Sequence, residues 1–321
     1  MGEDVLPQIS KIQKVLVVGA GAVGGYFGAL LIKSGVDLCF LVRENRFQVI
    51  SENGLKIVSA EGDFVVQPTL LKSLDKIEAV DLIILAVKCQ DLAPLLPQLV
   101  PLVEKGAVIL TLQNGVGAED DILNYYEKPC VLAGVAFITA RLNQLGVVEH
   151  ARRGMITLGE LSGEQSPRAE AVHHLLSEAG IHCRLSTDIR RDKWKKLCWN
   201  ATFNPLSVIL DYPISLVLGH TELKEIVRKG IAEIIAVAAS EGIFIKQKII
   251  EQTIEASYDL KDYYTSMYED YRQGKETEVE YLNGDLLRRG KKNGVPTPVN
   301  EMLYALVKGL QMKNRLKENL K

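Results

Sequence analysis

The chain has few of the residues that mark secreted, metal-binding and nucleic-acid-binding proteins. Its 321 residues include five cysteines, which are widely spaced and form no C-x-x-C pair. This favours free thiols in a reducing compartment over a disulfide framework. No cluster of histidine and cysteine has the spacing of metal ligands, so we expect no metal. No long basic run occurs and the net charge is −2, which argues against a nucleic-acid surface.

The N-terminal residues lack the features of a targeting signal. The segment MGEDVLPQIS is acidic and poor in apolar residues, unlike a signal peptide. One uncharged stretch, Val15–Ile32, has the length of a membrane span, but its many glycines would weaken a helix and no second span follows. We therefore expect a cytoplasmic protein without membrane contact.

Apolar residues are plentiful, and in the first half of the chain they alternate between strand-like and helix-like patterns. Hydrophobic residues make up 47% of the sequence, enough for two cores. The predicted strands are Lys14–Val18, Val36–Val42, Leu55–Val58, Phe64–Val66, Asp81–Val87, Ala107–Leu112, Val131–Ala140, Met155–Leu158 and Ile181–Leu185. Helices are predicted over Ala22–Ser34, Leu92–Glu104 and Pro167–Ala179. This alternation predicts an α/β fold with a doubly wound parallel sheet, covered by helices on both faces.

After Thr187 the pattern becomes almost entirely helical. Helices are predicted from Ile189 onward and over Thr221–Glu241, Lys246–Leu260, Thr277–Arg289 and Val299–Lys317. The sequence therefore predicts a Rossmann domain over residues 1–187 and an all-helical domain over residues 188–321.

A glycine-rich segment follows the first predicted strand. Gly19-Ala20-Gly21-Ala22-Val23-Gly24 matches the pattern G-x-G-x-x-G and opens a predicted helix. The first glycine permits a tight turn, the second lets the backbone approach a pyrophosphate, and the third lets helix and strand pack closely. The helix N-terminus offers N–H groups and a positive dipole end to phosphates. We predict that these six residues bind a dinucleotide; the alternative is a purely structural turn.

The end of the second predicted strand bears on the choice between NAD and NADP. An NAD-selective site places an acidic residue there, which binds the ribose 2′-hydroxyl. Here the first polar residue is Arg43, whose guanidinium suits a 2′-phosphate, and Arg46 offers a second contact. The sequence therefore favours NADPH. The alternative is that Arg43 is a solvated charge and Glu44 binds the ribose.

Two further predicted strands end in polar residues, at the edge of the sheet where open α/β folds bind ligands. Lys88 follows one of them and is a candidate for contact with a cofactor phosphate or a substrate carboxylate. Asn114 follows the other, and its donor and acceptor suit a carboxamide or a carboxylate. Asn114-Gly115 is also a common turn dipeptide, so a structural role is the alternative.

The segment Arg191–Pro205 carries an unusual polar face. On a helix, Lys196, Asn200 and Asn204 lie four residues apart on one side. Pro205 is expected to break or kink the helix there. Reduction of a ketone needs a proton donor, and a half-buried lysine with a lowered pKa can serve. The alternative is that the lysines of this segment form an ordinary solvated face.

Together these separated motifs resemble the ketopantoate reductase (2-dehydropantoate 2-reductase) family over nearly the whole chain. They occur in the family's order: the Gly19 loop, Ala86-Val87-Lys88, Gln113-Asn114-Gly115, Trp194–Asn200, Asn204-Pro205-Leu206, Thr277-Glu278 and Tyr281-Leu282-Asn283-Gly284. The resemblance implies a Rossmann domain followed by a helical domain like that of 6-phosphogluconate dehydrogenase. It also implies NADPH-dependent reduction of 2-dehydropantoate to (R)-pantoate, a step toward pantothenate and coenzyme A.

The resemblance also assigns roles to single residues. Lys196 would be the general acid, and Glu278 would bind substrate and hold the lysine ammonium. The residues implied in substrate contact are Asn114, Asn200, Asn204 and Ser266, and those implied in cofactor contact outside the glycine loop are Arg43, Lys88 and Asn114. From the residues alone, Glu278 would be read as a helix-capping or solvated charge.

One departure from the family's pattern leaves the substrate open. The family commonly carries an asparagine after the proline that follows the Asn-Pro-Leu motif, whereas Ile214 follows Pro213 here. A paralogous reductase of another small 2-keto acid is therefore an alternative, and an NADPH-binding redox sensor without turnover is a second. A homodimer is left open by the sequence.

Overall fold

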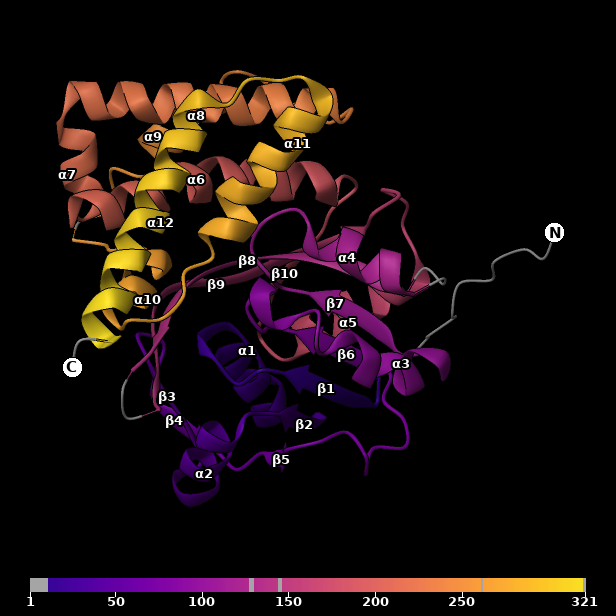
Figure 1. Ribbon diagram of the computed structural model, residues 1–321. Coiled ribbons are helices and arrows are strands. Elements are labelled where there is room, and N and C mark those ends of the chain that lie inside the picture. The colour runs from indigo at the N-terminus through magenta and orange to yellow at the C-terminus, as the bar shows by residue number, and fades with distance from the viewer. Residues whose placement is uncertain (1–10, 127–129, 144–145, 261, 320–321) are drawn as a thin grey trace. The chain divides into compact units, whose positions relative to one another are not determined.

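The computed structural model describes residues 11–126, 130–143, 146–260 and 262–319 (Figure 1). The chain divides into two compact units. The first comprises the chain up to Gln113 together with Ala118–Ile189, and the second comprises Asn114–Gly117 together with the chain from Arg190 onward. The short segment after Gln113 thus belongs to the second unit, although it directly follows a strand of the first.

The first unit is built on one sheet. Its central strands are β1 (Lys14–Val18), β2 (Asp37–Leu41), β5 (Thr69–Leu71), β6 (Leu82–Leu85), β7 (Val108–Thr111) and β8 (Val131–Leu142). They pair in parallel in the order β5-β2-β1-β6-β7-β8, so the strand order reverses between β1 and β6. This is the Rossmann order. The sheet continues beyond β8 through β9 (Val148–Glu160), β3 (Leu55–Ser59), β4 (Phe64–Val66) and β10 (His182–Leu185).

Side chains alternate between the two faces of this sheet and build a core on each. The covering helices are α1 (Ala22–Lys33), α3 (Leu96–Glu104), α4 (Ala118–Tyr125) and α5 (Pro167–Glu178). In β1, Val15 and Val17 pack in the core that contains residues of α1 and α5. Leu16 and Val18 pack in the core that contains residues of α3 and α4. Both faces are therefore apolar, as the uninterrupted hydrophobic strands require.

The strand predicted over Met155–Leu158 is longer in the structure. It forms β9 and pairs antiparallel with β8, with register shifts between Phe137 and Ile138 and between Thr139 and Ala140. Exposed Arg152 and Arg153 lie within β9. These charges and irregularities obscure the period-two pattern that reveals a strand in a sequence.

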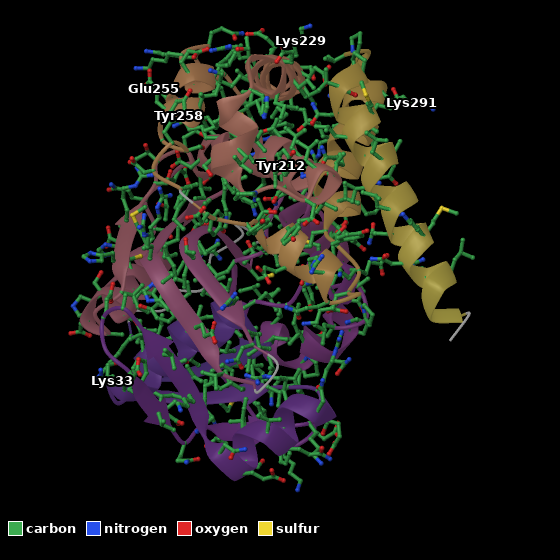
Figure 2. The ribbon with its side chains drawn as sticks, turned by 90° about the vertical axis from the view of Figure 1, so that its left-hand side faces the viewer. Lys33, Tyr212, Lys229, Glu255, Tyr258 and Lys291 are labelled. Carbon is green, nitrogen blue, oxygen red and sulfur yellow. The ribbon has the colours of Figure 1, made fainter. Side chains whose placement is uncertain are left out.

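Several short helices of the structure were not predicted from the sequence. They are α2 (Glu44–Asn53), α4, α7 (Ile214–Gly219) and α10 (Ser266–Arg272). Conversely, the helix predicted over Lys246–Leu260 shortens to α9 (Ile249–Glu255). Tyr258 lies beyond its end and is exposed, as Figure 2 shows beside Glu255. Short helices bury few residues and give little periodic signal.

The second unit is helical in its described part. Its longer helices are α6 (Ile189–Leu210), α8 (Thr221–Ser240), α11 (Asp285–Asn293) and α12 (Pro298–Asn319). α8 packs against α7, α9, α11 and α12. Trp194, Leu197 and Phe203 of α6 are buried in the core of this unit.

α6 continues through Pro205 to Leu210, so the helix does not break at this residue, which was one of the two predicted outcomes. Proline has no N–H, so it cannot donate to the carbonyl of Ala201 four residues earlier. The buried side chain of Asn283 donates to that carbonyl instead, at 2.7 Å. A long-range hydrogen bond thus satisfies the acceptor that proline leaves without its helical partner.

Asn283 itself lies in an irregular turn. The helix predicted over Thr277–Arg289 starts with one π-helical turn, η2 (Glu280–Gly284), before it continues as α11. Such turns are rare and occur frequently at functional sites. The predicted fold class, a doubly wound Rossmann sheet followed by a helical region, is confirmed.

Candidate functional site

The glycine loop of the first unit has the features that a dinucleotide requires. Gly19 has φ +100°, and a Cβ there would lie 2.8 Å from a methyl group of Val87. A Cβ on Gly24 would lie 2.1 Å from the carbonyl oxygen of Gly19. A Cβ on Gly21 would meet no atom within 4 Å. The outer glycines therefore allow the tight turn and the close packing, and the middle one leaves space for a ligand.

The N-terminus of α1 is suited to an anion. Gly21 is its N-cap residue, no side chain caps the helix, and no acidic residue lies in its first turn, which begins with Ala22 and Val23. The N–H groups of this turn and the positive end of the helix dipole favour negative charge. The cradle in this loop therefore fits the pyrophosphate of a dinucleotide.

The side chain of Arg46 is hydrogen-bonded to the backbone of the glycine loop. Its half-buried guanidinium donates to the carbonyl oxygen of Ala20 at 2.9 Å and 3.1 Å, and to that of Gly146 at 2.9 Å. Burial lowers the pKa of Arg46 from its ordinary value. The sequence suggested a cofactor contact for Arg46, and the structure shows it holding the loop backbone in place.

Arg43 is the N-cap residue of α2, and Val42 separates it from Leu41 at the end of β2. Its side chain is 75% exposed and forms an ion pair with Asp91 at 2.5 Å. The neighbouring carboxylate of Glu44 is paired with Lys72 at 2.8 Å. The guanidinium of Arg43 and the carboxylate of Glu44 thus both lie beyond the carboxyl end of β2, both are exposed, and each forms an ion pair.

Lys88 follows β6 and is half-buried at the N-cap of the short 3-10 helix η1 (Cys89–Asp91). The parallel register of β1 and β6 pairs Val18 with Leu85, so the glycine loop and the Lys88 segment leave the sheet at the same edge. The structure thus places Gly19, Arg43 and Lys88 beyond the carboxyl ends of neighbouring strands.

In the second unit, three predicted site residues come together. The ammonium of Lys196 donates to the side-chain oxygen of Asn114 at 2.9 Å. The side-chain nitrogen of Asn114 donates to Glu278 Oε2 at 3.1 Å. An ammonium only donates and a carboxylate only accepts, so these partners fix the orientation of the amide. Asn114 therefore links a cation to an anion through one side chain.

The environment of Lys196 adjusts its acidity. The pKa of Lys196 is lowered to about 8, mainly by burial and in addition by the nearby charge of Lys193. Glu278 acts in the opposite direction and raises the pKa. The ammonium is thus a stronger acid than an ordinary lysine, yet it is mostly protonated at neutral pH.

The segment Asn114–Gly117 is fastened to the helical unit by several contacts. Gly115 has φ +87°, and a Cβ there would lie 2.7 Å from the carbonyl oxygen of Tyr281. Arg289 donates to the carbonyl of Val116 at 3.3 Å and pairs with Asp285 at 2.8 Å. Gly115 is therefore required by both its backbone conformation and its close neighbour. Asn114-Gly115 can therefore form a structural turn and still present the Asn114 side chain to a ligand, so the two predicted roles are compatible.

The glutamates around position 278 differ in their partners. Glu276 forms an exposed ion pair with Arg315 at 3.1 Å. Glu280 accepts from Tyr304 at 2.6 Å and from Arg288 at 2.6 Å. Glu278 accepts from Asn114. Of these three glutamates, Glu278 is the one that the family motif singles out. It is also the one hydrogen-bonded to Asn114, the partner of Lys196.

The other predicted substrate contacts have different surroundings. Asn200 and Asn204 lie on α6 in helical register with Lys196, and both are buried. The Oδ1 atom of Asn204 has no hydrogen-bond partner in the described part of the chain. Ser266 is exposed at the first residue of α10, and no hydrogen bond among the described residues joins it to Lys196.

The lysines near Lys196 do not form one solvated face. Lys193 is 5% exposed, whereas Lys195 is half-buried and pairs with Asp192 at 3.1 Å. Ile214, which departs from the family's pattern, is fully buried in the helical core. Its backbone N–H donates to the carbonyl of Tyr263 at 3.0 Å.

Sequence reasoning missed two residues that support these sites. One is Arg46 as a support of the glycine loop, and the other is Asn283 as a support of α6. The sequence did contain an indication of the role of Asn283. Pro205 in a predicted helix leaves a backbone carbonyl without its donor, and Asn283 is a motif residue with a side chain that can donate. No sequence rule indicates which carbonyl a distant arginine or asparagine will bind.

Comparison with known proteins gives a consistent result. The family model described as ketopantoate reductase PanE/ApbA matches residues 15–163, and its C-terminal counterpart matches residues 188–311. The chain is 32% identical to a 2-dehydropantoate 2-reductase from Nostoc sp., over 94% of this chain and 97% of that protein.

No helix in the described residues is long and apolar enough to cross a membrane.

Solved structures show the same similarity. A 2-dehydropantoate 2-reductase from Geobacter metallireducens superposes with a TM-score of 0.88 at 33% identity, covering 92% of this chain and 99% of that one. A D-mandelate dehydrogenase in complex with NADH and anilino(oxo)acetate superposes with a TM-score of 0.87 at 29% identity, covering 94% of this chain and 99% of that one.

Proposed function

Because the chain belongs to the ketopantoate reductase family, we propose that it uses NADPH to reduce 2-dehydropantoate to (R)-pantoate, with Lys196 as the proton donor. The observation that carries this proposal is the Lys196–Asn114–Glu278 chain of hydrogen bonds. It combines a lysine of lowered pKa with a carboxylate and an amide, as a site for an oxo-acid requires. The reaction is a step toward pantothenate and coenzyme A.

The first unit would hold the cofactor. The glycine loop Gly19–Gly24 binds the pyrophosphate, Arg43 binds the 2′-phosphate, and Lys88 binds a further cofactor phosphate or the substrate carboxylate. NADPH supplies the hydride when it is bound there. Support comes from the open position at Gly21, the uncapped α1 and the exposed guanidinium of Arg43.

The second unit would supply the acid chemistry. As hydride reaches the ketone carbon, negative charge develops on the oxygen, and the Lys196 ammonium stabilises that charge and gives it a proton. Asn114 holds the ammonium by its amide oxygen and contacts substrate or cofactor. Glu278 fixes the other end of that amide and binds the substrate hydroxyl. Asn200, Asn204 and Ser266 bind the rest of the substrate.

A second candidate is the reduction of a different small 2-keto acid. Ile214 occupies a position where the family commonly carries asparagine, and its side chain is buried in the helical core. The similar D-mandelate dehydrogenase is recorded with NADH and anilino(oxo)acetate, so relatives of this fold include proteins with an aromatic ligand. A redox sensor without turnover is the weaker alternative, because it has no need for a lysine of lowered pKa beside a carboxylate.

One assay tests the proposal and its alternatives. Oxidation of NADPH and of NADH is followed with 2-dehydropantoate and with a panel of branched and aromatic 2-keto acids. We expect the highest kcat/KM with NADPH and 2-dehydropantoate. A higher value with another 2-keto acid would establish the paralogous reductase, and tight NADPH binding without turnover on any substrate would support the sensor.

A further inference from the structure

The described residues of the first unit contain buried side-chain polar atoms without a hydrogen-bond partner, and all belong to residues that follow two neighbouring strands. They are Gln90 Oε1, Gln113 Nε2 and Gln113 Oε1. Gln90 lies in η1, shortly after β6, and Gln113 follows the end of β7. β6 and β7 are neighbouring parallel strands, so both glutamines lie beyond the carboxyl end of the same part of the sheet.

Such atoms are unusual inside a protein. The large majority of buried side-chain polar atoms are hydrogen-bonded, and an unmade bond to a buried amide opposes folding. Gln113 is 5% exposed and leaves both its donor and its acceptor unused. A residue kept in this condition at the ligand edge of a sheet points to a partner that arrives with the ligand.

The strand order identifies the part of the ligand concerned. In a Rossmann sheet each half binds one mononucleotide, and the dinucleotide crosses the point where the strand order reverses. That point lies between β1 and β6 here. Arg43, after β2, belongs to the half that binds the adenosine part, whereas Gln113, after β7, belongs to the half that binds the nicotinamide part.

We propose that the side-chain amide of Gln113 binds the carboxamide of the nicotinamide ring. This inference rests on the proposed function, because it assumes a nicotinamide dinucleotide in the first unit. A carboxamide has one carbonyl acceptor and two N–H donors, so it can satisfy Gln113 Nε2 and Gln113 Oε1 together. Gln90 Oε1, at the neighbouring strand end, offers an acceptor of the same kind. Bonds to the carboxamide fix the rotation of the ring and thus the face that it presents to substrate.

The test measures binding without turnover. Dissociation constants are determined by fluorescence or calorimetry for NADPH, for its reduced 3-acetylpyridine analogue, which keeps the carbonyl and loses the N–H₂ group, and for 2′,5′-ADP, which lacks the nicotinamide half. We expect wild type to bind NADPH about five-fold more tightly than the analogue, the scale of one net hydrogen bond. In Gln113→Met this preference should fall to nearly one, while the Kd of 2′,5′-ADP stays unchanged.

A matched control separates this effect from a general loss of structure. Gln98 is exposed on α3, so Gln98→Met should leave all three dissociation constants at their wild-type values. Because Gln113→Met removes two unsatisfied atoms, it should also raise the Tm of the nucleotide-free protein by about 2 °C. The variant would then be more stable and bind NADPH less well.

Several outcomes would overturn the inference. Equal weakening of NADPH and the analogue would mean that Gln113 makes no bond to the N–H₂ group of the carboxamide, and a lower Tm of the nucleotide-free variant would show that its amide is satisfied within the protein. A loss of 2′,5′-ADP affinity would place the effect outside the nicotinamide half. By contrast, a wild-type protein that binds neither NADPH nor 2′,5′-ADP would overturn the proposed function itself.

Discussion

The ammonium of Lys196 and the side-chain oxygen of Asn114 lie 2.9 Å apart, although 82 residues separate them along the chain. The same amide donates to Glu278 at 3.1 Å. Asn114 reaches these partners because the segment Asn114–Gly117 folds with the helical unit, held by Arg289 and by the close approach of Gly115 to Tyr281. The acid group of the proposed reaction is therefore positioned by a residue that follows a strand of the Rossmann sheet.

Replacing Lys196 by alanine should remove the proton donor. We expect kcat to fall about 100-fold or more, the scale of a lost general acid, while the Kd of NADPH changes little. Lys195→Ala is the matched control, because the Lys195 side chain is 40% exposed and pairs with Asp192 on the same helix, so its kcat should stay near wild type. Steady-state kinetics and NADPH titration measure both; unchanged kcat in Lys196→Ala would exclude this residue as the acid.

Replacing Arg43 by alanine should weaken NADPH selectively. A lost charge-assisted bond to the 2′-phosphate should raise the Kd of NADPH about 10-fold or more and leave that of NADH nearly unchanged. Arg141, an exposed arginine of the same unit that pairs with Glu149, provides the control substitution to alanine. If both nucleotides lose affinity equally in Arg43→Ala, the guanidinium does not contact a 2′-phosphate.

Exchanging Asn114 for aspartate should change the acidity of Lys196 in a known direction. A carboxylate beside the ammonium favours its charged form, so the pKa of Lys196 should rise from about 8. The alkaline limit of kcat/KM should move to higher pH, while kcat falls because Glu278 loses its amide donor. A pH profile that keeps its wild-type limit would show that position 114 does not influence the group that titrates.

Asn283 and Pro205 should be energetically coupled. Asn283→Ala leaves the buried carbonyl of Ala201 without a donor, and we expect the free energy of unfolding to fall by about 1–3 kcal/mol. In Pro205→Ala the new backbone N–H can bond that carbonyl, so Asn283→Ala should cost less in this background. Denaturant titration of the four proteins of this double-mutant cycle measures the difference. Asn283 also donates to the side-chain oxygen of Asn300 at 3.1 Å, and additive effects would mean that it stabilises the unit by this bond rather than by replacing the missing donor.

The sequence predicted the central sheet well, because the strands of a parallel sheet are continuous apolar runs, such as those around Val17 and Ile84. It also placed Lys196, Asn200 and Asn204 on one helix. It did not predict that α6 continues through Pro205, because the local rule for proline does not include a donor from Asn283. The length of β9 was also missed, because exposed Arg152 and Arg153 interrupt its pattern.

The candidate site was predictable only in part. Glycine spacing identifies the loop at Gly19, since its chemistry is local. By contrast, Glu278 is distinguished from Glu276 and Glu280 in the structure by its partner Asn114, and partners depend on the tertiary fold. The unpartnered amide of Gln113 is likewise invisible in a sequence, because burial without a hydrogen bond is a property of the folded chain.

The most direct test of the account is the pH dependence of kcat/KM in both directions with the best substrate pair. The pKa of Lys196 is about 8, so reduction should be constant below this pH and fall about tenfold with each further unit, because the acid must be protonated. Oxidation of the hydroxy acid should rise through the same pH, since the neutral amine then accepts the proton. A reduction rate that shows no decline above pH 8, or the same decline in Lys196→Ala, would contradict the claim that Lys196 donates the proton.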